Sequence, residues 1–285
     1  MLKKTTKKEG LPSRRPFIIF TFVLSSPSAS KGSLPVANLV PKQWVLVRGI
    51  MSEAFHWWDF LPQLQARFPQ DQFHTADILG NGRHHQHSTP LNLKKNIHAL
   101  REQVPAEGKK ILLGFSLGGM LSLEWAHHHP DEVEAVILIN CSLNNSPVYK
   151  RITPYSLKQI FHSSLQKDIS RREEMIIRMT TSGIPQERIE QVASHWGPRG
   201  VEYPVKPINF LWQLFLAAQV PQRPTPPAPV LVLSSGKDKV VHPECSQKIA
   251  EVWNLPLVRH PEAGHDLTLE DPQWVLEQVE RFVRR

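Results

Sequence analysis

Cysteine is scarce in this chain: only Cys141 and Cys245 occur among 285 residues, and they lie far apart in the sequence. Two distant cysteines exclude a disulfide framework, allow at most one bridge and offer no spacing typical of metal ligands. No uninterrupted apolar run approaches the roughly 20 residues that cross a bilayer. We therefore expect a soluble protein without stable membrane insertion.

Acidic residues are rare at the start of the chain, where positive charge gathers. The formal net charge is +8, and residues 1–15 contain six Lys or Arg against a single Glu. A basic surface spread over the whole protein would indicate a nucleic-acid or anionic membrane partner. Because the excess positive charge is concentrated in one short segment, we expect no nucleic-acid partner. The sequence does not predict the oligomeric state.

Residues 1–40 are interpreted as a basic leader. Arg14 and Arg15 precede a short apolar run at 17–24, and small residues follow at 25–30, in the order of a secretory or twin-arginine signal. The apolar run is short, however, and no Ala-x-Ala cleavage site follows it. A disordered leader, or a start codon placed too far upstream, explains the same residues. We expect a cytoplasmic protein, with export as the alternative.

From residue 43 onward, short apolar runs alternate with amphipathic stretches, which predicts an α/β fold with a mostly parallel sheet flanked by helices. The predicted strands are residues 44–48, 73–77, 110–114, 135–140, 230–234 and 255–259. The last helix is expected to begin after Asp271 as N-cap, with Pro272 in its first position.

One interval, residues 142–229, breaks this alternation and ends in a proline-rich stretch. It is too long for a simple crossover, so we predict a helical cap inserted into a core formed by residues 41–141 and 230–285. Within it, residues 210–218 are apolar almost all round. That pattern is typical either of a helix buried on all sides or of a wall that faces the substrate.

The stretch Gly114-Phe115-Ser116-Leu117-Gly118-Gly119 fits the GxSxG pattern of a nucleophile elbow, between a predicted strand and a helix-like stretch. Ser116 is therefore the predicted nucleophile, since the context argues against a chance match. The flanking glycines leave room for its strained turn. The Leu117 N–H, at the positive end of the following helix, is a predicted oxyanion donor.

A serine nucleophile needs a base, and the base needs an orienting carboxylate. Two later loops supply them, because Asp238 and His265 each follow a predicted strand. We therefore predict a catalytic triad of Ser116, His265 and Asp238. The alternatives are His260 or His242 as the base and Asp266 as the orienter.

The loop after the first predicted strand is expected to supply the second oxyanion donor, the Ile50 N–H, because Gly49 lets that backbone approach the site. Trp57, close to this loop, is interpreted as a wall of the acyl pocket or as a packing residue. Trp212 and Phe215 are predicted to line a pocket for short or medium aliphatic or aromatic acyl groups.

Together these residues resemble the α/β-hydrolase superfamily, in its capped branch of serine esterases. The resemblance covers residues 43–285 and includes a glycine turn at 80–83. It departs from the usual pattern at Arg48, where His is common, and at Leu79, where Pro is common. Arg48 is interpreted as a structural hydrogen-bonding residue, with contact to an anionic substrate group as the alternative. Two N-terminal strands of the superfamily fold have no evident counterpart.

The resemblance implies a hydrolase that cleaves a carboxylic ester or related small-molecule acyl compound through an acyl-serine, with no metal or organic cofactor. Acyl transfer, thioester cleavage and C–C bond hydrolysis use the same triad. A non-catalytic binding protein on this fold is the alternative of another class. Histidine clusters at 84–87 and 127–129 lack partners at the spacing of a metal site, so they are interpreted as surface residues.

Overall fold

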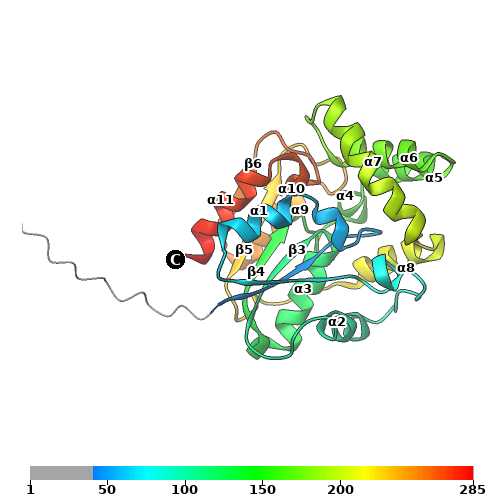
Figure 1. Ribbon diagram of the computed structural model, residues 1–285. Helices are drawn as coiled ribbons and strands as arrows, with labels where there is room; N and C mark the ends of the chain where they lie inside the picture. The colour runs from blue at the N-terminus through cyan, green and yellow to red at the C-terminus, as the bar shows by residue number, and fades with distance from the viewer. Residues whose placement is uncertain (1–40, 285) are drawn as a thin grey trace, which may run out of the picture. The chain divides into compact units, whose positions relative to one another are not determined.

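The computed structural model describes residues 41–284, so the predicted leader lies outside the described residues. Its centre is a six-stranded sheet in which every neighbouring pair of strands is parallel, in the order β2-β1-β3-β4-β5-β6 (Figure 1). The strands are β1 (Gln43–Val47), β2 (Gln72–Ala76), β3 (Lys110–Phe115), β4 (Val133–Ile139), β5 (Val230–Ser235) and β6 (Leu257–His260). The predicted α/β fold with a parallel sheet is confirmed.

The strand order reverses between β1 and β3, which makes their carboxyl ends a topological switch point. The chain passes from β1 outward to β2 and then returns to the other side of β1 as β3. The loops that follow β1 and β3 therefore diverge toward opposite faces of the sheet, and ligands of open α/β sheets bind at such a switch point. Ser116 directly follows β3, and Arg48 directly follows β1.

Both faces of the sheet are buried, because alternate side chains along each strand enter different cores. Val45 and Val47 pack with α2 (Leu93–Arg101), α3 (Leu117–His128) and α9 (Glu244–Trp253). Trp44 and Leu46 pack with helices on the opposite face. Those helices are α1 (Phe60–Arg67), α10 (Leu267–Glu270) and α11 (Pro272–Val283).

Local capping explains where the last helix begins. The Asp271 carboxylate accepts a hydrogen bond of 3.0 Å from the Trp274 N–H, and Pro272 occupies the first turn of α11, as predicted. This helix buries Val275 and Val279.

Short 3-10 helices occur at η1 (Ala54–Trp57), η2 (Gly82–His84) and η3 (Pro130–Glu132).

Five helices lie between β4 and β5 in the chain, in the segment predicted as a cap. They are α4 (Val148–Arg151), α5 (Pro154–Ser164), α6 (Ile169–Thr180), α7 (Gln186–Glu202) and α8 (Pro207–Gln219). In Figure 1, α5, α6 and α7 lie together, apart from α1 and α11. Helices α6 and α7 share a small core that includes Ile177, Val192 and Trp196 and also receives Leu269 from α10.

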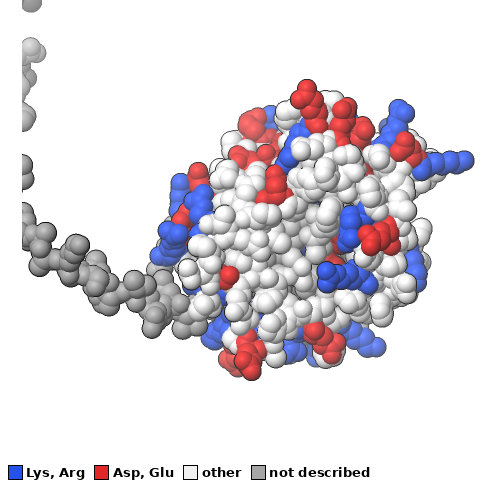
Figure 2. Space-filling model, viewed as in Figure 1, with Lys and Arg blue, Asp and Glu red and all other residues white. Residues whose placement is uncertain are grey.

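Helix α8 differs from a helix that is buried on all sides. Its buried residues are Asn209, Gln213 and Leu216, whereas Leu211 and Phe215 are 53% and 52% exposed. Of the two interpretations from the sequence, the helix buried on all sides is therefore wrong, because Leu211 and Phe215 are half-exposed. No helix within residues 41–284 is long and apolar enough to cross a membrane. Figure 2 shows acidic and basic side chains interspersed over the face in view.

Candidate active site

Ser116 occupies the turn that joins β3 to α3, with backbone angles of φ 52° and ψ −121°. A non-glycine residue in this region is strained, and such strain is typical of a nucleophile elbow. Gly114 and Gly118 are required by close approach: a Cβ on Gly114 would lie 2.3 Å from the Gly119 Cα, and one on Gly118 would lie 2.1 Å from the Val47 carbonyl oxygen. The Ser116 side chain is left at the carboxyl end of the sheet.

His265 and Asp238 are joined by a hydrogen bond of 2.7 Å between His265 Nδ1 and Asp238 Oδ2. Both residues are buried. The other oxygen of Asp238 accepts the Val240 and Val241 N–H groups at 2.8 and 2.9 Å. These bonds fix the carboxylate, and the carboxylate in turn places the imidazole proton on Nδ1, so Nε2 is free to accept a proton.

The other histidines considered from the sequence lie in different surroundings. His260 Nε2 is 3.2 Å from Asp271 Oδ2, and its Nδ1 accepts the Ala263 N–H at 2.9 Å. His242 is exposed and lies beside Glu244. The side chain of Asp266, although next to His265 in the chain, is bonded to Arg48. Of these candidates, only His265 is paired with Asp238.

The loop after β1 lies directly against the nucleophile. A Cβ on Gly49 would be 3.1 Å from the Ser116 Cβ. Within residues 41–284, the backbone N–H groups of Ile50 and Leu117 donate to no other group. Both are therefore free donors at the loops that flank Ser116, the positions predicted for an oxyanion hole.

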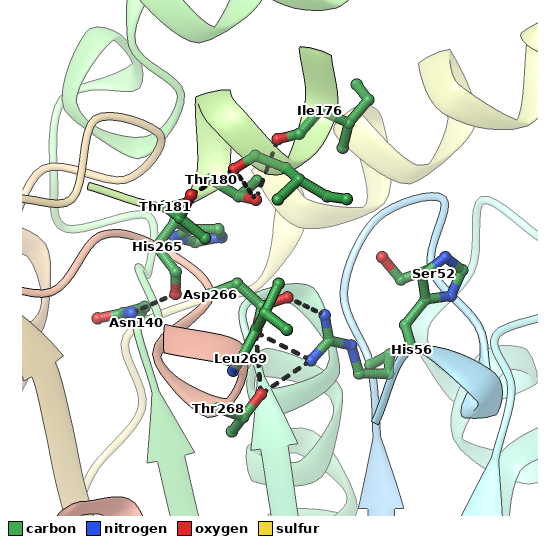
Figure 3. A network of polar contacts seen from close by, with 12 residues as sticks. Ser52, His56, Asn140, Ile176, Thr180, Thr181, His265, Asp266, Thr268 and Leu269 are labelled. Atoms are coloured by element: carbon green, nitrogen blue, oxygen red, sulfur yellow. Dashed lines mark hydrogen bonds and ion pairs between the residues drawn. The ribbon is translucent and has the colours of Figure 1, made fainter. Parts of the chain in front are cut away.

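Asn140 is a residue of this site that the sequence did not reveal. Its Nδ2 donates to the His265 carbonyl oxygen at 2.6 Å (Figure 3). Nδ2 also donates to Ser235 Oγ at 2.9 Å, and Oδ1 accepts the Ser235 N–H at 2.8 Å. Asn140 has φ 52°, a backbone conformation that Asn tolerates better than most residues. The signal available in the sequence was an Asn at the end of a buried apolar strand.

Arg48 is buried and its guanidinium is paired with Asp266. The guanidinium carbon lies 5.0 Å from the centre of the Trp57 ring. Trp57 is 1% exposed and belongs to the core cluster that contains Phe60. Burial favours the second interpretation of Trp57 from the sequence, a packing residue, because its ring is enclosed by the core and by Arg48.

The other two pocket candidates differ from each other. Trp212 is partly buried, and Phe215 is 52% exposed. Half-exposure places Phe215 on the outer side of α8, which disfavours it as a pocket residue. Trp212 stays a prediction.

The α4–α8 segment is hydrogen-bonded to the loop that follows β1 and to the turn that carries His265. Gln213 Oε1 of α8 accepts the Met51 N–H at 2.8 Å, one residue after Ile50. At the end of α6, the Thr180 carbonyl oxygen accepts the Asp266 N–H at 2.7 Å, one residue after His265 (Figure 3). The position of this segment is thus coupled to the loops that carry Ile50 and His265.

Both cysteines are buried and unpaired. Burial raises the pKa of the Cys141 thiol to about 12, so this thiol, which donates to the Ser116 carbonyl oxygen, stays protonated. Within residues 41–284, no group of three His, Cys, Asp or Glu residues is placed to hold a metal ion.

The fold and the serine turn define a class of protein, and comparison with known sequences agrees with it. A family model described as the alpha/beta hydrolase family matches residues 44–278. The chain belongs to the alpha/beta hydrolase family. The predicted resemblance is confirmed.

Curated relatives are similar over part of the chain. A pimeloyl-[acyl-carrier protein] methyl ester esterase of Edwardsiella ictaluri is 28% identical over 149 residues, which are 50% of this chain and 54% of that protein. The protein of the same name from Xanthomonas campestris pv. campestris is 34% identical over 86 residues, 30% of this chain and 32% of that one. The chain thus spans about half the length of the first of these relatives and a third of the second.

Solved structures share the fold. The 2-hydroxy-6-oxo-6-phenylhexa-2,4-dienoate hydrolase of Rhodococcus sp. strain RHA1 superposes with a TM-score of 0.67 at 17% identity, covering 86% of this chain and 91% of that one. The esterase RhEst1 of Rhodococcus sp. ECU1013 gives 0.64 at 17% identity, covering 86% and 90%. At this identity the likeness establishes the fold alone.

Proposed function

We propose that this protein is a serine hydrolase that cleaves a carboxylic ester, or a related acyl compound, through an acyl-serine intermediate. The observation that carries the proposal is the buried 2.7 Å hydrogen bond between His265 and Asp238, at the same edge of the sheet as the Ser116 turn. A histidine oriented by a carboxylate is the base that a serine hydroxyl needs at neutral pH.

In the acylation step, His265 Nε2 accepts the hydroxyl proton of Ser116 while the serine oxygen bonds to the carbonyl carbon of the ester. The carbonyl oxygen becomes an oxyanion, to which the N–H groups of Ile50 and Leu117 donate. The tetrahedral intermediate collapses, the ester C–O bond breaks, and His265 gives its proton to the leaving alcohol. A water molecule repeats these steps on the acyl-serine, which releases the acid and restores Ser116.

The α4–α8 segment, residues 142–229, is proposed as the cap that covers Ser116 and selects acyl groups. Its hydrogen bonds to Met51 and Asp266 support this role, because both residues adjoin groups of the proposed mechanism. Trp212 is the residue of α8 proposed to meet the acyl chain. Its partial burial, on a helix whose inward face adjoins the Met51 loop, supports that choice.

The curated relatives support an ester as the first substrate class to test, since their names specify methyl ester esterases. Thioester cleavage, acyl transfer and C–C bond hydrolysis would use the same three residues. A non-catalytic binding protein is disfavoured, because loss of a triad residue is its usual mark and Ser116, His265 and Asp238 are all present.

The test is a fluorophosphonate probe together with a panel of p-nitrophenyl esters from acetate to octanoate. Wild-type protein is expected to be labelled on Ser116 and to hydrolyse esters, whereas Ser116→Ala abolishes labelling and leaves only residual turnover. His265→Ala is expected to be as damaging as Ser116→Ala. His260→Ala is the matched control and should be mild. Labelling that persists in Ser116→Ala would contradict the proposal.

A further inference from the structure

Arg48 carries a charge in a place where charges are costly. Its side chain is 3% exposed, and that of its partner Asp266 is 4% exposed. A buried ion pair recovers its desolvation cost only with good geometry, and replacing such a pair by apolar residues is often neutral for stability. A contribution to folding stability is therefore a weak explanation for the presence of this ion pair. Its position beside the turns that carry Ser116 and His265 is a stronger explanation.

The guanidinium makes directional contacts with the turn that carries His265. Nη2 donates to Asp266 Oδ2 at 2.5 Å, and Nη1 donates to Thr268 Oγ1 at 3.2 Å and to Asp266 Oδ1 at 3.4 Å. Figure 3 labels the two acceptor residues, Asp266 and Thr268. Asp266 directly follows His265 in the chain. The planar fork of arginine thus fixes both oxygens of the carboxylate, which a single-point donor such as lysine cannot do.

The same guanidinium also contacts the nucleophile turn. Its central carbon lies 4.4 Å from the centre of the Phe115 ring, and Phe115 directly precedes Ser116. The Phe115 ring in turn lies 4.8 Å from the His265 ring. Arg48 itself precedes Gly49 and Ile50, the loop with the free N–H donor. One side chain therefore meets neighbours of the nucleophile and the base, and its own backbone leads into the oxyanion loop.

We propose that Arg48 is a positioning residue that holds the Ile50 loop, the Ser116 turn and the His265 turn at fixed distances from one another. This role rests on the proposed hydrolase function. Reacting groups must be aligned to a fraction of an ångström, and a displacement of about 1 Å can cost on the order of 100-fold in rate. In this proposal the Arg48–Asp266 pair maintains that alignment.

The electrostatics keep the pair ionised. Burial alone would raise the pKa of Asp266, but the charge and hydrogen bonds of Arg48, together with the Thr268 hydroxyl, outweigh burial and hold it below its ordinary value. The Asp266 carboxylate also accepts the Leu269 N–H at 3.3 Å as the N-cap of α10. The His265 turn is thus fastened to the start of a helix as well as to Arg48.

Direct binding of an anionic substrate by Arg48 is the competing interpretation, and the contacts disfavour it. Nη1 and Nη2 are occupied by Asp266 and Thr268. Nε is buried and has no hydrogen-bond partner within residues 41–284. Because the Arg48 side chain is only 3% exposed, a substrate carboxylate could reach its remaining N–H groups only if the residues around them moved.

Two variants separate positioning from stability. The double variant Arg48→Met/Asp266→Asn removes both charges while the Asn side chain keeps the N-cap acceptor of α10. Arg48→Lys keeps the charge but loses the fork. The matched control is Arg67→Met/Glu280→Gln, which removes the ion pair between α1 and α11. For each protein we would measure the melting temperature, kcat and KM for p-nitrophenyl butyrate, and the labelling rate of Ser116.

We expect the double variant and Arg48→Lys each to lose roughly 100-fold in kcat and in labelling rate, with KM within about threefold of wild type. The control should keep its kcat. Should the double variant not fold, Arg48→Lys decides alone. A wild-type kcat in the variants, or a raised KM at unchanged kcat, overturns the positioning role. A wild-type protein that neither reacts with the probe nor cleaves esters overturns the hydrolase function, and the positioning role with it.

Discussion

Asn140 Nδ2 donates a 2.6 Å hydrogen bond to the backbone carbonyl oxygen of His265. The two residues are 125 positions apart in the chain. The same amide bonds to Ser235, three residues before Asp238, so one side chain joins the end of β4 to the loops that carry the base and the carboxylate. Arg48 bonds to Asp266, the residue after His265. The His265 turn is therefore held both at the His265 carbonyl and at the Asp266 side chain.

The Asn140 bonds predict a specific pair of phenotypes. Asn140→Gly suits the φ of 52° but loses the amide, whereas Asn140→Ala loses the amide and also strains the backbone. We expect both variants to lose about 10-fold or more in kcat, and Asn140→Ala alone to lose a further ~1 kcal/mol of stability. Steady-state kinetics and chemical denaturation measure these effects. Normal kcat in Asn140→Gly would mean that the amide does not position His265.

Asp238→Asn tests the orienting carboxylate. The amide keeps the size of the side chain but no longer favours a proton on His265 Nδ1, so we expect kcat to fall by on the order of 10⁴. The ester assay measures this loss, and unchanged melting would show that the fold is intact. Near-normal turnover would assign the orienting role to another carboxylate.

Gln213 of α8 links the α4–α8 segment to the oxyanion loop. Its Oε1 accepts the Met51 N–H at 2.8 Å, and its Nε2 donates to Asn81 Oδ1 at 2.7 Å. Gln213→Leu removes the partner of the Met51 N–H and leaves the buried Asn81 Oδ1 without this donor, which costs ~1–3 kcal/mol for the buried oxygen, and it frees the loop that carries Ile50. We expect lower stability and a kcat about 10-fold lower. The control is Gln219→Leu, an exposed position on the same helix, and equal effects of the two changes would refute the link.

The lowered pKa of His56 leads to a prediction of how folding stability depends on pH. Burial, and next the nearby Arg48 charge, lower its pKa from 6.5 to about 3, so the folded protein keeps this ring neutral. Below pH 6.5 the unfolded chain binds a proton that the folded chain does not. The stability that His56 contributes is complete above pH 6.5 and is lost as the pH falls toward 3.

The size of this loss should be roughly 2–3 kcal/mol at pH 4.5. His56→Asn is the control, because an amide oxygen can accept the Glu53 N–H that His56 Nδ1 accepts at 3.0 Å, yet does not titrate. Denaturation of both proteins from pH 4.5 to 7.5 isolates the contribution of His56. Parallel stability curves would show that this histidine titrates normally.

The sequence predicted the sheet well because each strand is marked locally. All six strands lie within one or two residues of their expected bounds, and β3 and β4 are runs that both faces of the sheet bury. The glycines of the Ser116 turn are equally local signals. Arg48 illustrates the limit: its residue type was visible, but its partner Asp266 lies 218 positions away.

The sequence also did not predict which side chains of α8 point toward the rest of the protein. A helix rich in apolar residues gives little periodicity, so the face that turns inward is set by partners elsewhere in the chain. Those partners are polar groups of Met51, Asn81 and Thr89, which form hydrogen bonds with the side chains of Asn209 and Gln213. The inward face is therefore amide-rich, and Phe215 turns outward.

This arrangement sharpens the prediction for acyl selectivity. Trp212 lies four residues before the buried Leu216 and is partly buried, whereas Phe215 is 52% exposed. If Trp212 meets the acyl chain, Trp212→Ala should change kcat/KM unequally across the p-nitrophenyl ester series, by about 10-fold between acetate and octanoate. The labelling rate of Ser116 should change less. Phe215→Ala is the matched aromatic control and should leave the series parallel to wild type. An equal loss for all esters in Trp212→Ala, together with a lower melting temperature, would mean that Trp212 only stabilises the segment and that other residues select the substrate.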